Sequence, residues 1–269
     1  MTAKGLSPEM IRDARRRLLR LHFESRTGHL GGNLSCLDIL LCLHHEVMTA
    51  DDVFILSKGH SAGALYVTLW STGRLAEEDL RNYHTDGTRL GVHPPPHGIP
   101  GIVFATGSLG HGLGLAAGMA LAKKLRSEPG RVFCLTSDGE WNEGSCWESL
   151  IFAVQHGLDN LTFIVDVNGM QGFGPTCEIA DLAPLAEKFQ AFRVSTHELD
   201  GHDHSALTAR LRGPQVGVRG VLAKTHKGNG VSFMQDRWQC HYLPLDEHQY
   251  RKALEEVDRT CEESSLTRS

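Results

Sequence analysis

The chain has 269 residues, and its 27 Lys and Arg against 32 Asp and Glu give a net charge of −5 with His neutral, which argues against a general nucleic-acid binder with its usual basic patch or high pI. No apolar run reaches the roughly 18 residues of a membrane helix, and the opening Met-Thr-Ala-Lys-Gly lacks the apolar core of a signal peptide. Seven cysteines without a C-x-x-C pair favour reduced thiols over a disulfide framework or a zinc site, so we expect a cytoplasmic protein that binds neither nucleic acid nor a membrane.

Helix-start residues and apolar runs predict the elements of the first half of the chain. Ser7 followed by Pro8 is typical of a helix start, and Ser35 with Asp38 has the spacing of a capping box that would open a second helix. Four prolines and three histidines between residues 84 and 101 indicate an ordered but irregular loop. The expected elements are helices over 8–24, 35–47, 61–69 and 113–125, a strand over 53–56, and a loop over 26–32.

The second half alternates apolar runs with helical spacers. The expected strands cover residues 131–136, 161–167, 192–194 and 220–224, and the expected helices cover 145–155, 181–189, a segment around 207–211, and 246–257. This alternation predicts an α/β fold, a parallel sheet with helices on both faces. Because we find no internal repeat and no linker, the simplest interpretation is a single domain over residues 1–269.

Polar residues follow two of the predicted strands at the point where each strand ends. Asp138 and Gly139 come after the strand over 131–136, and Asn168 comes after the strand over 161–167. If these strands are parallel neighbours, both side chains emerge at the carboxyl edge of the sheet, where open α/β sheets bind ligands. Mg²⁺ binds such carboxylate and amide oxygens, with phosphate oxygens completing its octahedron. On these residues alone, a helix cap at Asp138 and a turn at Asn168 explain the pattern equally well.

Six blocks in chain order resemble those of the transketolase family. Asp138-Gly139 followed by Asn168 resembles the thiamine-diphosphate fingerprint G-D-G…N, and residues 138–144 are similar to its transketolase form. The other blocks are Thr27-Gly28-His29, Leu56-Ser57-Lys58-Gly59-His60, Gly91-Val92-His93-Pro94, residues 105–110, and residues 224–230 with 238–241. Together they cover about residues 7–257.

The chain departs from the family pattern at three places. Ser137 stands where the fingerprint usually has its first Gly, and His111 stands where the family often has Gln. The loop at 94–97 is longer by one residue, so His97 is an alternative to His93 as the counterpart of the family's histidine.

The resemblance implies a thiamine-diphosphate-binding domain of the PP type, with thiamine diphosphate and Mg²⁺ as cofactors. By this match, Mg²⁺ would be held by Asp138, Asn168 and the backbone carbonyl of Met170. The cofactor would contact Gly107, Leu109, Gly139 and His60, as well as Asp138 and Asn168. The residues implied in catalysis are His29, His60, His93, His241 and Glu143, of which Glu143 matches a glutamate that couples two cofactor sites across a dimer interface.

The resemblance also implies a function and a partner. The chain would be the diphosphate-binding subunit of a two-component transketolase-like enzyme that transfers a two-carbon ketol unit from a ketose phosphate to an acceptor. The cofactor acts as the electron sink, and neutral histidines can move protons near pH 7. Full-length relatives continue into a pyrimidine-binding domain, and none fits in residues 262–269. We therefore expect a separate pyrimidine-binding/C-terminal subunit, an α2β2 assembly, and no activity from this chain alone.

Several alternatives stay open at this stage. The two-carbon unit could pass to a lipoyl or carrier-protein thiol, as in an E1-like subunit, or the chain could be a subunit that only scaffolds or regulates. His202 and His204 in Gly-His-Asp-His have the residue types of a metal motif, but we expect a loop there. Cys146 is expected to pack at an interface. His44, His45 and His156 lie in predicted helices, where we expect surface or packing roles.

Overall fold

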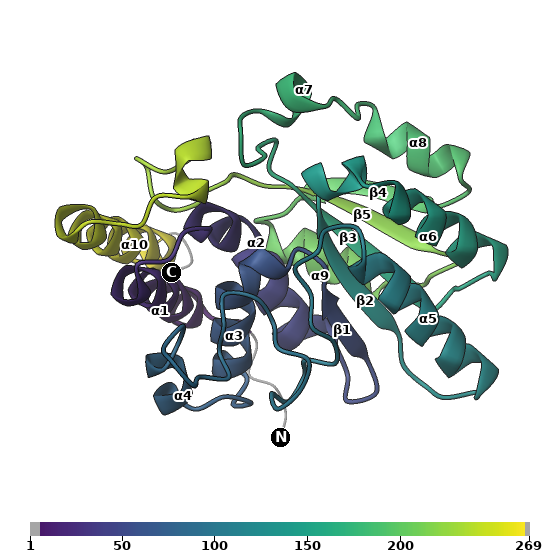
Figure 1. The fold of residues 1–269 in the computed structure, drawn as a ribbon, viewed down its shortest axis with the longest axis horizontal. Helices are drawn as coiled ribbons and strands as arrows, with labels where there is room; N and C mark the ends of the chain where they lie inside the picture. Colours follow the sequence, from purple (N-terminus) through teal and green to yellow (C-terminus); the bar gives the residue numbers. More distant parts are fainter. Residues whose placement is uncertain (1–5, 267–269) are drawn as a thin grey trace.

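Within residues 6–266, which the computed structural model describes (with side chains for residues 6–260), five strands form one sheet. The strand order is β1-β2-β3-β5-β4, and every neighbouring pair runs parallel (Figure 1). The strands are β1 (Val53–Leu56), β2 (Val132–Ser137), β3 (Leu161–Val167), β4 (Ser195–Asp200) and β5 (Arg219–Lys224). The predicted parallel sheet is confirmed. The opening Met-Thr-Ala-Lys-Gly, and residues 267–269 of the segment 262–269, lie outside the described residues.

Helices cover both faces of this sheet, as predicted. Successive strand residues point to opposite faces, so β2 contributes Phe133 and Leu135 to one core and Val132 and Cys134 to the other. The helices on the first face are α1 (Pro8–Ser25), α2 (Leu30–Cys42), α3 (Ala62–Ser71) and α9 (His204–Arg212), and those on the second are α5 (Gly112–Leu125), α6 (Gly144–Gln155) and α8 (Leu185–Ala191).

The remaining helical elements are short or peripheral. α10 (Glu247–Leu266) packs beside α1 at the left of Figure 1. The short elements are α4 (Glu77–Arg81), α7 (Thr176–Ile179), a π-helical turn (Leu43–Val47) and 3₁₀ turns at Gly59–Ser61, Gly139–Asn142 and Trp238–His241. No helix in the described part of the chain combines the length and the apolar character needed to span a membrane.

The first helix begins where the sequence predicts. Ser7 Oγ accepts the backbone N–H of Met10 at 3.2 Å, and Pro8 occupies the first helical position, where its missing N–H leaves no helical bond unmade. The helix ends at Arg26, whose φ of 52° is left-handed and whose N–H bonds back to the last turn. A local polar signal was sufficient here because the cap uses only neighbouring residues.

The predicted start of the second helix was wrong. α2 begins directly after His29, and Ser35 and Asp38 are buried inside the helix instead of capping it. Their polar groups make tertiary contacts: Ser35 Oγ donates to Asp166 at 2.6 Å, and Asp38 accepts from Arg15 at 2.8 Å. A three-residue spacing fits a cap and a buried polar pair equally well, and only the partners distinguish them.

The edge strand was also misplaced. Residues 192–194, expected as a strand, form the turn after α8, with Arg193 at a φ of 65°. β4 begins at Ser195 and is only partly buried, so it lacks the continuous apolar run that marks a central parallel strand. The helix expected over 181–189 is divided into α7 and α8.

Two further expectations concern single residues. Cys146 was expected at an interface, but its side chain is fully covered within this chain, and its Sγ donates to the Glu140 carbonyl at 3.4 Å; that prediction was wrong. His44 is buried against the ring of Phe54, in agreement with a packing role. The irregular loop is confirmed, since residues 82–111 contain neither helix nor strand.

Candidate functional site

The carboxyl ends of β2 and β3 bring Asp138 and Asn168 together. The strands pair in parallel with Ser137 opposite Asp166, so the residues after them emerge at the same edge, as predicted. Asp138 Oδ2 accepts the backbone N–H of Gly169 at 2.8 Å, directly beside Asn168. Asp138 also caps the short helix that follows it, so the cap interpretation and the site interpretation are both compatible with the structure.

A cavity of about 340 Å³ opens at this edge. Its lining includes every residue expected in the site except Glu143: His29, His60, His93, His241, Gly107, Leu109, Asp138, Gly139, Asn168 and Met170. The other lining residues are Gly32, Ser137, Gln171, Gly172, Phe173, Lys227 and Tyr242. Glu143 lies exposed immediately before α6. His97 does not line the cavity, which favours His93 as the counterpart of the family's histidine.

The histidines of four separate segments form one cluster. The ring centre of His29 lies 4.7 Å from that of His241, 5.5 Å from that of His60 and 6.3 Å from that of His93. His29 stands at the start of α2 in a left-handed conformation, with its backbone N–H donating to the carbonyl of His241 at 2.7 Å. His60 belongs to the 3₁₀ turn after β1, and His241 ends the 3₁₀ turn after β5.

Burial keeps these imidazoles neutral. Burial, reinforced by Lys58 and the neighbouring histidines, lowers the pKa of His60 well below its usual value. Burial and the Lys227 ammonium lower the pKa of His241 to about 3, and burial with His93 lowers that of His29. A neutral imidazole has one donor and one acceptor nitrogen, so the cluster can hold hydroxyl groups and exchange protons with them.

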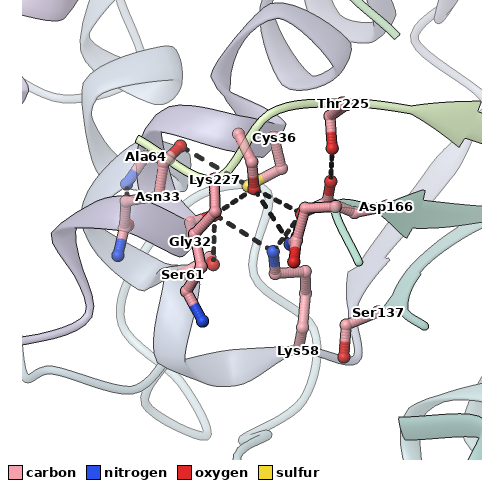
Figure 2. Close-up of polar contacts among 12 residues, drawn as sticks. Gly32, Asn33, Cys36, Lys58, Ser61, Ala64, Ser137, Asp166, Thr225 and Lys227 are labelled. Atoms are coloured by element: carbon pink, nitrogen blue, oxygen red, sulfur yellow. Dashed lines mark hydrogen bonds and ion pairs between the residues drawn. The ribbon is translucent and has the colours of Figure 1, made fainter. Parts of the chain in front are cut away.

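A buried ion pair forms the floor beneath Asn168. Lys58 donates to Asp166, both side chains are fully buried, and the Thr225 hydroxyl donates to the same carboxylate (Figure 2). Burial alone would raise the pKa of Asp166, but the Lys58 ammonium and the hydroxyl donors hold that pKa below its usual value. Asn168 Nδ2 donates to Asp166 Oδ2 at 3.3 Å and to Ser35 Oγ at 3.4 Å. These contacts orient the amide with its nitrogen toward the floor.

The oxygen atoms at the cavity wall fit a divalent cation. The carboxylate of Asp138, the amide oxygen of Asn168 and the carbonyl of Met170 are the hard ligands that Mg²⁺ prefers. Burial and the nearby Asp166 carboxylate raise the pKa of Asp138 to about 6, so a cation beside it would relieve an unfavourable negative charge. No metal-binding group of three or more His, Cys, Asp or Glu occurs in the described residues. Phosphate oxygens would therefore have to complete the coordination.

Two residues suited to an anion were missed by sequence reasoning. Lys227 Nζ donates to the carbonyls of Met170 at 3.3 Å and Gln171 at 3.2 Å, and it lies 3.4 Å from His241 Nδ1. Gln171 Nε2 is buried without a hydrogen-bond partner among the described side chains, which leaves a donor available at the wall. Lys227 lies inside the block over residues 224–230, so the signal was present. Gln171 had none beyond its place three residues after Asn168.

The sequence of the chain matches a family model and proteins of known activity. The model described as transketolase, thiamine diphosphate binding domain, matches residues 23–260. A subunit of the apulose-4-phosphate transketolase of Actinobacillus succinogenes is 37% identical over 255 residues, covering 90% of this chain and 92% of that relative. The 6-deoxy-6-sulfo-D-fructose transketolase subunit SqwG of Clostridium sp. is 34% identical over 244 residues, covering 86% and 89%.

The fold matches a solved transketolase. The crystal structure of transketolase from Campylobacter jejuni superposes with a TM-score of 0.83 at 25% sequence identity, over 93% of this chain and 42% of that one. This chain therefore spans less than half of that transketolase. The cavity, the ordered sequence blocks and these matches lead to one conclusion: the chain belongs to the transketolase family and corresponds to its thiamine diphosphate binding domain.

Proposed function

We propose that this chain is the diphosphate-binding subunit of a two-component transketolase-type enzyme that moves a two-carbon ketol unit from a ketose phosphate to an acceptor. The observation that carries the proposal is the cavity, where oxygen ligands, an amide donor without a partner among the described residues, a lysine and neutral histidines face one another. The two relatives named above, each of them one subunit of a transketolase, match almost end to end. Residues 1–269 would form one thiamine-diphosphate-binding domain.

The wall of the cavity would hold Mg²⁺ and the diphosphate. Asp138, Asn168 and the carbonyl of Met170 would ligate the metal, and Lys227 and Gln171 would meet phosphate oxygens. Gly139 would admit the diphosphate because a Cβ there would lie 2.9 Å from the Gln171 side chain, so the position has no room to spare. Gly107 and Leu109 line the same cavity and would contact the rings of thiamine diphosphate.

The histidine cluster would handle the sugar. Thiamine diphosphate, when bound, supplies the electron sink for breaking a carbon–carbon bond next to a carbonyl. The imidazoles of His29, His60, His93 and His241 would bind substrate hydroxyls and accept or return their protons. Proton transfer by a positioned imidazole is most effective when the ring is neutral and within hydrogen-bond reach. The cluster meets the first condition, because burial lowers the pKa of all four rings.

A partner chain would complete the site. Among the described residues that line the cavity, Asp138 is the one carboxylate and there is no glutamate. Phe173 and Tyr242 line the cavity and are 78% and 48% exposed, and exposed apolar groups around a cleft mark an interaction surface. We expect a pyrimidine-binding subunit to cover this mouth and supply the activating glutamate. In an α2β2 assembly, the exposed Glu143 would lie at the contact between two copies.

Calorimetry and turnover with and without the partner test the proposal. The partner is a chain with transketolase pyrimidine-binding and C-terminal domains from the same organism, co-expressed and identified by co-purification. We expect the complex to bind thiamine diphosphate only with Mg²⁺ present and to consume a ketose phosphate. Turnover by the isolated chain would contradict the partner requirement, and absence of cofactor binding by the complex would contradict the function and favour a scaffolding role.

The acceptor is tested in the same assay. The two relatives act by name on different sugars at similar identity, so likeness alone does not choose a substrate. Aldose phosphates and a dihydrolipoyl carrier are supplied in parallel with an isotopically labelled ketose. Transfer of label to the aldose is expected, and transfer to the dihydrolipoyl thiol would establish the E1-like alternative instead.

A further inference from the structure

A buried polar cluster lies outside the cavity, behind the segment that carries Lys227. Its centre is Asp38 on α2, whose side chain is 2% exposed and accepts from Arg15 Nη2 at 2.8 Å. His202 Nδ1 lies 2.8 Å from the same carboxylate, and His204 Nε2 lies 3.2 Å from it. Burial alone would raise the pKa of Asp38, but the Arg15 guanidinium and the two histidines hold that pKa well below its usual value. Asp38 is therefore a buried, ionised hydrogen-bond acceptor.

His202 connects this carboxylate to the backbone of the neighbouring segment. The backbone N–H of His226 points at His202 Nε2, with the two nitrogens 3.1 Å apart. A backbone N–H can only donate, and an ionised carboxylate can only accept. Nε2 must therefore carry the lone pair and Nδ1 the proton, so these two partners select one neutral tautomer of His202.

The segment held in this way places the lysine of the cavity. Residue 226 directly precedes Lys227, whose ammonium reaches the carbonyls of Met170 and Gln171. The segment is also attached at Gly228, whose N–H donates to the Gly31 carbonyl at 2.9 Å, and at Asn229, whose Nδ2 donates to Asp38 at 3.2 Å. Asp38 thus receives bonds from both sides of Lys227, through His202 on one side and Asn229 on the other.

We propose that His202 is a positioning residue for the cavity: Asp38 orients its ring, and its Nε2 holds the backbone at His226 so that Lys227 faces the ligand. This assigns a role to the Gly-His-Asp-His segment that is neither metal binding nor an incidental loop. Asp203 in the same segment caps α9 by accepting from Ser205 and Ala206, which fixes the turn that presents His202. The proposal rests on the proposed function only in taking the ligand of Lys227 to be a diphosphate.

Two substitutions separate the two nitrogens of His202. In His202→Gln the terminal amide oxygen can replace Nε2 as acceptor for the His226 N–H, whereas in His202→Asn the shorter amide can replace only the Nδ1 donor to Asp38. His204→Ala is the matched control, because His204 contacts the same carboxylate while the bond to the backbone at residue 226 comes from His202. Thermal unfolding of each full-length variant verifies that it is folded.

Three readouts decide the proposal. Long-range ¹H–¹⁵N spectra of the wild-type chain should show His202 protonated at Nδ1. Amide hydrogen exchange at residue 226 should be about five-fold or more faster in His202→Asn, since one hydrogen bond is lost, and near the wild-type rate in His202→Gln and His204→Ala. Calorimetry with inorganic pyrophosphate and Mg²⁺ should show a loss of affinity of about five-fold in His202→Asn alone.

The outcomes also separate this proposal from the proposed function. A proton on Nε2, or exchange at residue 226 that is unchanged in His202→Asn, overturns the positioning role whatever ligand the cavity binds. An equal effect in His204→Ala overturns it as well, because the effect would then belong to Asp38 and not to the bond to residue 226. If the wild-type chain and its complex bind neither pyrophosphate nor thiamine diphosphate, the proposed function fails while the exchange rates still decide the role of His202.

Discussion

The carboxylate of Asp138 serves the backbone and the cavity at the same time. One oxygen accepts from Gly139 and the other from Gly169, both at 2.8 Å, and Thr176 Oγ1 adds a longer contact of 3.3 Å. Burial and the charge of Asp166 make this an unfavourable place for a second negative charge. A bound cation would compensate for that repulsion, so the residue should matter far more to ligand retention than to folding.

Asp138→Ala is expected to weaken thiamine diphosphate and Mg²⁺ binding by the complex by roughly ten- to a hundred-fold, as for loss of a charged hydrogen-bonding group. Asp138→Asn keeps the shape and one acceptor oxygen but removes the charge, so an intermediate loss is expected. Titration calorimetry measures both affinities. Affinity equal to wild type in the alanine variant would contradict the assignment of Asp138 as a metal ligand.

His60 should act on the rate more than on the cofactor. It lies among the other imidazoles of the cluster and does not contribute to the oxygen ligands. His60→Ala is expected to lower kcat by roughly a hundred- to ten-thousand-fold, the range for loss of a general acid or base, while the Kd for thiamine diphosphate changes little. His97→Ala is the control, because His97 is exposed and outside the cavity. Loss of cofactor affinity with unchanged kcat would show that His60 only binds.

At the scale of elements, α2 joins most parts of the site. Its first residue follows His29, its Ser35 supports Asn168, and its Asp38 holds the segment before and after Lys227. The helix is buried along its whole length, so its polar side chains must find partners within the protein. These buried polar contacts place residues of the site from three other segments relative to one helix.

Glycines at the start of α2 allow the close approach that this arrangement needs. A Cβ at Gly31 would lie 2.1 Å from Cys240 Sγ, in the turn that ends at His241. We expect Gly31→Ala to destabilise the chain by about 1–3 kcal/mol through overpacking and to displace His241. Gly118→Ala in α5 is the control: a Cβ there meets no atom within 4 Å, so the higher helix propensity of alanine should stabilise the chain by up to about 1 kcal/mol. Urea unfolding compares the two variants, and equal effects would contradict the close packing.

At the scale of the whole molecule, buried histidines should make the fold sensitive to acid. Burial lowers the pKa of His22 to about 4 and that of His44 to about 3. His44 has no hydrogen-bond partner for either ring nitrogen within the described residues. Because the unfolded chain binds protons at these rings from about pH 6.5 downward and the folded chain does not, the free energy of unfolding should fall as the pH is lowered.

Each buried histidine should contribute about 1.4 kcal/mol of lost stability per pH unit between roughly pH 6 and its folded pKa. His44→Leu keeps an apolar side chain of similar size in the pocket beside Phe54 and removes one titrating group. We expect the variant to resemble wild type at pH 8, within about 1.5 kcal/mol, and to lose less stability at pH 5. Guanidinium unfolding across this range provides the measurement, and parallel curves for the two proteins would show that His44 is not responsible.

The central strands and the residues at their ends could be predicted from the chain itself, because each signal is local. A continuous apolar run marks a strand buried on both faces, and the polar residue after it must lie at the carboxyl edge, as Asp138 and Asn168 do. The same holds for the start of α1, where the cap and the helix are neighbours in sequence. The ordered blocks were sufficient to name the four histidines that meet in the cavity.

Other features depended on contacts between distant residues. Lys58 and Asp166 are 108 positions apart, and Ser35 and Asp166 are 131 apart, so no local pattern could show that they form the floor of the cavity. The start of α2, the place of the edge strand β4 and the roles of Lys227 and His202 were decided in the same way. A polar residue in a buried position is specified by its partner, and the partner is known only once the sheet and its helices have packed. The sequence by itself determined which chemical groups are present and at which edge of the sheet they gather, while the tertiary structure decided how each of them is oriented and held.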